Sequence, residues 1–105
     1  LTVRALATAS EFSAQNTANT LWALATLGDT QSATLVTAMA ARAEAMAHEL
    51  APQDVANTLW ALATIDLGVP ASVLQALAAR VEAVAGVMAF HNISNTLWAL
   101  ATMHA

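Results

Sequence analysis

The stretch that decides the fold is Ala18-Asn-Thr-Leu-Trp-Ala-Leu-Ala-Thr26, because it returns unchanged from Ala56 to Thr64 and with one change from Ser94 to Thr102. The period is 38 residues, as marked by the three tryptophans Trp22, Trp60 and Trp98. A fixed period of this size indicates one supersecondary unit copied along the chain, each copy burying its apolar face against its neighbours. The repeat therefore predicts a solenoid.

Each period divides into two helices. Residues 14 to 27 contain neither Gly nor Pro, Ser13 suits the N-cap, and Gly28 supplies a stop, which predicts a first helix over 14–27. In the second copy Pro52 suits the first helical position, so the equivalent helix covers about 52–65. The third copy places a first helix near 90–103.

The second helix of each repeat is predicted over about 31–47 and 70–85, where alanine is frequent and Arg4, Arg42 and Arg80 share the period. Short connections make sequential helices antiparallel neighbours. We therefore predict an all-α protein, an α-solenoid of antiparallel helical hairpins wound into a right-handed superhelix. We expect one segment of a longer array, with residues 1–11 ending a preceding repeat, 12–49 and 50–87 forming repeats, and 88–105 opening a further one.

The composition of the chain excludes several classes of site and function. The chain has 105 residues, a hydrophobic fraction of 58%, a formal charge of −4 and no cysteine, so disulfides and thiolate metal sites are excluded. Membrane insertion is not expected from the uncharged stretch Ala83–Met103, because it contains several amides and hydroxyls. There is no Gly-rich phosphate loop, no nucleophile–base arrangement and no metal-ligand spacing among His48, His91 and His104. We predict a non-enzymatic protein without metal or cofactor.

The polar side of the first helix is the candidate binding surface, because in the first copy it carries amides and hydroxyls and no charge. The pairs in its first turn vary between copies: Gln15-Asn16, Gln53-Asp54 and His91-Asn92. Such side chains could distinguish RNA bases, one per repeat. The alternative is that they are only favourable first-turn helix residues.

An asparagine repeats within this polar side, as Asn19, Asn57 and Asn95. Since Asn is a poor residue for a helix interior, either a hydrogen-bond ladder between repeats or contact with ribose and phosphate should account for it. The tryptophans are interpreted as packing anchors between hairpins, with base stacking as the alternative.

The chain has three arginines and no lysine, and Arg42 and Arg80 have two possible roles. They could bond to helix carbonyls or to an acid such as Glu44 or Asp54, or they could bind phosphate. The structural role is favoured because the chain is acidic overall, and nucleic-acid affinity usually rests on Lys and Arg.

The repeated phrase resembles a known family. Gln-Asn-Thr-Ala-Asn-Thr-Leu-Trp-Ala-Leu-Ala-Thr-Leu-Gly (15–28) and Gln-Asp-Val-Ala-Asn-Thr-Leu-Trp-Ala-Leu-Ala-Thr-Ile (53–65) are similar to the octotricopeptide repeat. The resemblance implies an α-solenoid of mitochondria or chloroplasts that binds single-stranded or ribosomal RNA along a surface lined by the first helices. The scarcity of Lys and Arg departs from a typical RNA binder.

Two function classes follow. The first is an RNA-binding helical-repeat module of an organellar gene-expression or ribonucleoprotein factor. The second is a non-catalytic scaffold that docks protein partners in a larger organellar complex. The fold alone supports both.

Overall fold

The computed structural model describes residues 8, 11–28, 33–65 and 68–104, with the side chain of His104 excepted. The α-helices and short 3-10 helices of this part of the chain are α2 (Ala14–Leu27), α3 (Ala33–Ala45), η3 (Ala47–Glu49), α4 (Pro52–Ile65), α5 (Ala71–Val84), η4 (Ala85–Val87) and α6 (Phe90–His104). No strand occurs among these residues. The predicted all-α class is confirmed.

The helix ends follow the local signals in the sequence. Ser13 caps α2, because its side-chain oxygen accepts the Asn16 N–H at 3.0 Å. Gly28 ends α2 in the left-handed region with φ of 67°, and its N–H donates to the Ala25 carbonyl at 3.2 Å. Helix α4 begins at Pro52, as predicted.

The second helices differ slightly from their predicted bounds. Helix α3 ends at Ala45, because the chain tightens into η3 before Leu50. Pro70 lies just outside α5 as its N-cap residue. Residues 31 and 32, where the second helix of repeat 12–49 was predicted to start, lie outside the described residues. The predicted end of a preceding repeat, from Leu1 to Ser10, also lies outside them, except for Thr8.

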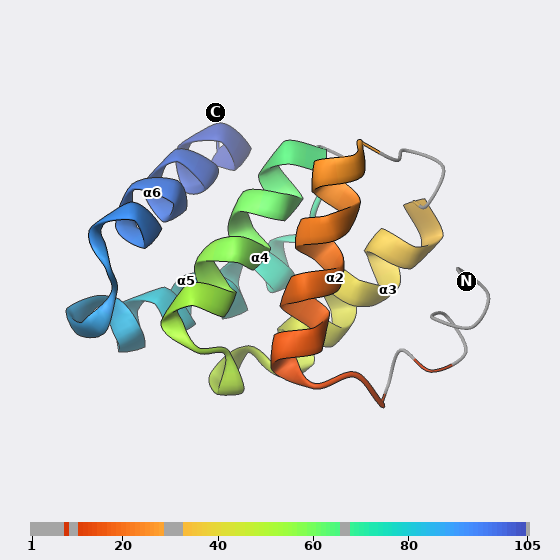
Figure 1. Ribbon diagram of the computed structural model, residues 1–105, viewed down its shortest axis with the longest axis horizontal. Coiled ribbons are helices and arrows are strands. Elements are labelled where there is room, and N and C mark those ends of the chain that lie inside the picture. The colour runs from red at the N-terminus through yellow and green to blue at the C-terminus, as the bar shows by residue number, and fades with distance from the viewer. Residues whose placement is uncertain (1–7, 9–10, 29–32, 66–67, 105) are drawn as a thin grey trace.

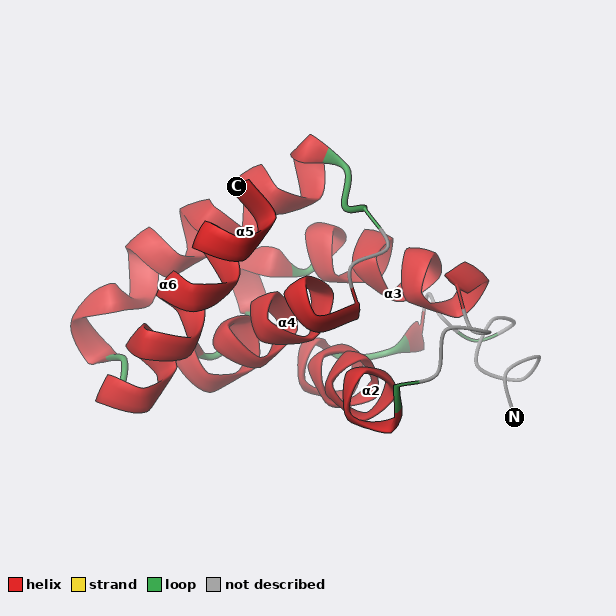
Figure 2. Ribbon diagram, turned by 90° about the horizontal axis from the view of Figure 1, so that it is seen from above, coloured by secondary structure: helices red, strands yellow, loops and turns green. Residues whose placement is uncertain are grey.

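The helices form two layers (Figure 1). Helices α2, α4 and α6 lie side by side with α4 in the middle, while α3 and α5 lie behind them. Figure 2, which views the molecule from above, shows that α2 and α3 lie in different layers. Helix α3 contacts α2 and α5, and α5 contacts α4, so the two layers enclose one core.

The core consists of alanine and large aliphatic side chains from both layers. Its largest fully buried apolar members are Leu21, Met39, Leu50, Leu59, Leu77 and Val55. Full burial of such a side chain stabilises the fold by about 1.5–3 kcal/mol relative to exposure. Alanine fills most of the remaining core positions, which allows the helices to approach closely.

Three faces of helices α2, α4 and α6 lie outside the contact with the second layer, and their members follow from the turn of about 100° between successive residues of an α-helix. In α2 the outer face, directed away from α3, consists of Gln15, Asn19, Trp22 and Thr26. The leading face, directed toward α4, consists of Ala14, Ala18, Leu21 and Ala25. The trailing face, on the opposite side, consists of Asn16, Thr20, Ala23 and Leu27. The positions 38 and 76 residues later define the same faces of α4 and α6.

Burial along the row of helices follows these faces. In α2 the leading face is buried and the trailing face is largely open. In α6 the reverse holds, because Thr96 and Ala99 of its trailing face are buried while Phe90 and Leu97 of its leading face are 90% and 62% exposed. Helix α4 buries most of both faces, since it has a neighbour on each side.

Candidate nucleic-acid interface

The outer faces of α2, α4 and α6 together form the candidate site, here called the outer surface. Each helix contributes a first-turn polar residue, an asparagine, a tryptophan and a threonine, in that order along its axis. In α4 these are Gln53, Asn57, Trp60 and Thr64, and in α6 they are His91, Asn95, Trp98 and Thr102. All residues of the outer surface are described, and none of them is Asp, Glu, Lys or Arg.

The tryptophans occupy the middle of each outer face. Trp22 and Trp98 are 46% and 49% exposed, whereas Trp60 is half-buried and packs against the core. Trp60 is covered more because α4 has a neighbouring helix on each side. The predicted role as a packing anchor is therefore confirmed for Trp60, while Trp22 and Trp98 present much of the indole to solvent.

The predicted asparagine ladder is wrong. No hydrogen bond within the described part of the chain involves the side chain of Asn19, Asn57 or Asn95. The reason is geometric: these side chains point outward, and packed helices lie about 8–10 Å apart, beyond the reach of one amide to the next. Asn19 and Asn95 are exposed and Asn57 is half-buried, so their donors and acceptors face solvent.

The structure separates the two residues of each variable first-turn pair. Gln15, Gln53 and His91 are exposed on the outer surface. Their partners lie on the trailing face, where Asn16 is exposed, Asp54 is half-buried and Asn92 is 6% exposed. Only the first residue of each pair therefore remains available to a ligand in all three copies.

Two threonines were not singled out from the sequence as interface residues. Thr58 and Thr96 share a position on the trailing face and are buried, and neither side-chain oxygen has a hydrogen-bond partner. The Thr17 hydroxyl, by contrast, donates to the Ser13 carbonyl at 2.8 Å. Recurrence at one position with period 38 was the available signal, but the repeat alone does not show which face is covered.

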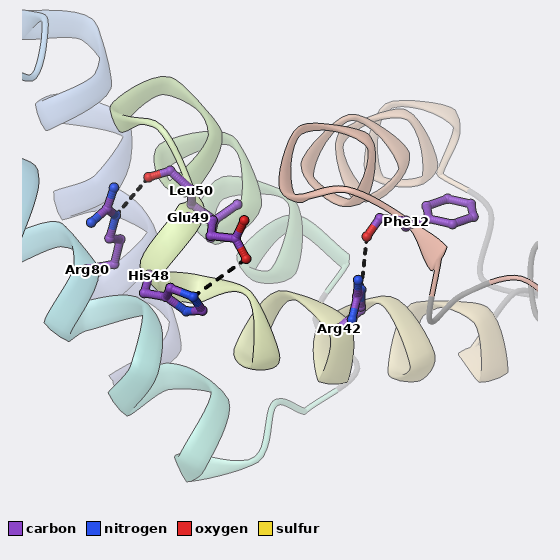
Figure 3. A network of polar contacts seen from close by, with 6 residues as sticks. All are labelled: Phe12, Arg42, His48, Glu49, Leu50 and Arg80. Atoms are coloured by element: carbon purple, nitrogen blue, oxygen red, sulfur yellow. Dashed lines mark hydrogen bonds and ion pairs between the residues drawn. The ribbon is translucent and has the colours of Figure 1, made fainter.

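The two described arginines bind the backbone (Figure 3). Arg42 Nε donates to the Phe12 carbonyl at 2.9 Å, and Arg80 Nε donates to the Leu50 carbonyl at 2.8 Å. Each bond joins a second helix to the chain just before the first helix of the same predicted repeat. The prediction of carbonyl binding is confirmed, although the acceptors precede the helices.

The third contact in Figure 3 is an ion pair on the protein surface. His48 Nε2 lies 3.5 Å from Glu49 Oε2, and the two side chains are 76% and 55% exposed. Exposed pairs of this kind contribute little to stability. The pair lies in η3 and not in the row of first helices, so it is separate from the outer surface.

Other chemistry is sparse in the described part of the chain. A largely apolar cavity lies between α3, α4 and α5, where Val36, Leu62 and Val73 line it and Glu44 is the one carboxylate among its described lining residues. Glu44 Oε1 accepts the Ser72 hydroxyl at 3.2 Å. No group of three or more possible metal ligands occurs among the described residues, and none of the described helices has the length and apolarity to cross a membrane.

Fold and site together define an all-helical protein with a repeated, uncharged polar and aromatic surface. The family model of the RNA-editing substrate-binding complex 6 protein matches residues 1–105. The chain belongs to this family. This match does not show the octotricopeptide repeat family that the repeated phrase resembles. No curated protein and no solved structure gives a match.

Proposed function

We propose that the chain is an RNA-binding helical-repeat module of a ribonucleoprotein complex, and that the outer surface contacts unpaired RNA. The observation that carries this proposal is that amide, hydroxyl and indole groups repeat on one accessible face of α2, α4 and α6, with no charged side chain among them. The name of the family, an RNA-editing substrate-binding complex protein, supports the same class of partner.

Base readout in this proposal rests on Gln15, Gln53 and His91. An amide can both donate to and accept from a base edge, and an imidazole can pair or stack. Asn19, Asn57 and Asn95 lie one turn further along the same face, where their free amides suit ribose or phosphate oxygens. Arg42 and Arg80 have a structural role, because their Nε groups bind backbone carbonyls.

The test is selection from a randomised single-stranded RNA pool at fixed salt, using the full-length protein. Gln53→His should change the preferred base at one position of the selected RNA and leave stability almost unchanged. Gln75→His is the matched control, because Gln75 is an exposed glutamine on α5 in the other layer. Absence of any RNA retention by the unmodified protein would refute the proposal.

We further propose that residues 12–49 and 50–87 are successive hairpins of an α-solenoid with a right-handed superhelix. Three repeated features support this: the 38-residue period, the two arginine–carbonyl bonds in the same register, and the shared pattern of leading and trailing faces. A solved structure of the full-length protein tests it, because further repeats should continue the row of α2, α4 and α6.

A protein scaffold is the second candidate function, and the leading face of α6 favours it. Phe90 and Leu97 are exposed there, at positions whose α4 equivalents are half-buried or buried against the neighbouring helices. The fitting partner is a helix with a trailing face of this repeat type. Leu97→Glu should then weaken protein assembly without changing RNA binding, as measured by co-purification of the complex and by RNA titration.

The proposed module is non-catalytic and uses no cofactor. Its proposed location is organellar, from the resemblance of the repeated phrase to proteins of mitochondria and chloroplasts. Imaging of the tagged full-length protein with an organelle marker tests it, and a purely cytosolic signal would contradict it.

A further inference from the structure

The row of tryptophans is not explained by packing alone. Trp22 leaves about half of its surface in water although Leu21 beside it is fully buried, and Trp98 is exposed to the same extent. Exposed apolar surface that gathers in one place on a soluble protein marks an interaction site. The indoles recur at the same point of α2, α4 and α6, in the centre of the outer surface.

The surroundings of each indole match the chemistry of a nucleobase. In α6, Asn95 lies three residues before Trp98 and Thr102 lies four residues after it, so hydrogen-bonding groups flank the aromatic surface on the same face. A nucleobase has a π-face for stacking and polar edges for pairing. An aliphatic partner would leave the flanking amide without a bond, which disfavours an apolar protein segment at this point.

Charge indicates how the surface would hold RNA. Neutralisation of phosphates by Lys and Arg normally dominates nucleic-acid affinity. The outer surface carries no such residue, and the two described arginines bind the backbone. Stacking is the remaining strong interaction that this surface offers to RNA, because it needs no protein charge.

We propose that Trp22, Trp60 and Trp98 are stacking platforms for unpaired nucleobases, one base for each first helix. The proposal rests on the proposed RNA-binding function and specifies its chemistry. Neighbouring packed helices lie about 8–10 Å apart, so each indole receives a separate base and not two bases that stack on each other. Trp60 contributes least, since it is more covered than the other two.

The experiment measures binding of the full-length protein to oligouridylate, with an RNA duplex as the comparison ligand. Trp98→Leu keeps an apolar side chain but removes the stacking surface, and it should lower affinity for the single strand by roughly fivefold to a hundredfold. The slope of affinity against salt should stay the same, because no phosphate contact is lost. Trp98→Phe should restore much of the affinity.

Phe90→Leu is the matched control, because Phe90 is an aromatic residue of the same helix that is 90% exposed but lies on the leading face. It should leave RNA affinity unchanged. If Trp98→Leu and Trp22→Leu both bind oligouridylate as tightly as the unmodified protein, the stacking proposal is wrong while RNA binding stands. Equal losses for the single strand and the duplex would also overturn it. Failure of the unmodified protein to bind any RNA would overturn both proposals.

Discussion

Leu21, Leu59 and Leu97 occupy the same position in α2, α4 and α6, and the same Leu→Ala substitution should have two different effects on stability. Leu21 and Leu59 are fully buried, whereas Leu97 is 62% exposed. Removing a buried leucine side chain costs about 2–5 kcal/mol, because apolar burial is lost and a cavity remains. An exposed position away from special contacts changes stability by only about 0.5 kcal/mol.

The assay is urea unfolding followed by far-UV circular dichroism, performed at two protein concentrations. Domains of this size have about 5–15 kcal/mol of stability, so Leu59→Ala should move the midpoint strongly and Leu97→Ala hardly at all. An equal loss at Leu97 and Leu59 would refute the assignment of faces. A midpoint of the unmodified protein that rises with protein concentration, and that loses this dependence in Leu97→Ala, would show that a second chain covers the leading face of α6.

The remaining predictions concern single polar contacts and one turn, and the same unfolding assay measures them. Arg80→Met removes the bond to the Leu50 carbonyl, a part-buried contact, and should cost about 1.5–3 kcal/mol; no change would show that the bond is dispensable. Thr58→Val should raise stability by up to about 1 kcal/mol, because the buried Thr58 hydroxyl has no hydrogen-bond partner. Thr17→Val should lower stability by about 1 kcal/mol, because the Thr17 hydroxyl donates to the Ser13 carbonyl. Equal effects of the two substitutions would contradict this reasoning. Gly28→Ala should cost about 1 kcal/mol because alanine is strained at φ of 67°, unless the end of α2 rearranges.

The sequence allowed the bounds of the first helices to be predicted to within one residue, because their end signals are strong and local. The N-cap at Ser13, the left-handed turn at Gly28 and the start at Pro52 each depend on a few neighbouring residues. The bounds of the second helices were predicted less accurately, because the alanine-rich sequence continues past Ala45, where α3 ends and the chain enters η3. Nothing in that composition shows where a helix tightens into a 3-10 turn.

The candidate site was predicted only in part, because periodicity shows which residues are equivalent but not which face is covered. The sequence grouped Asn16 with Gln15, and Asn92 with His91, as neighbouring polar residues of the first turn. Their side chains are about 100° apart around the helix, which places one on the outer face and the other on the trailing face. In α6 that trailing face lies against α4, and Asn92 is buried. The asparagine ladder failed for a related reason, since repetition in register was interpreted as contact.

The leading and trailing faces differ in composition, so each first helix packs its leading face against the trailing face of the next first helix. The leading face of α2 is Ala, Ala, Leu and Ala, while the trailing face of α4 presents Asp54, Thr58, Ala61 and Ile65 to it. Small residues on one side permit close approach, and the other side contributes polar groups that lose water as the helices meet. Two leading faces would not reproduce this match, so a further helix of the same type fits α6 only through its own trailing face. Such a head-to-tail contact keeps every outer face on the same side, and the row of Trp22, Trp60 and Trp98 would continue across it with the same spacing.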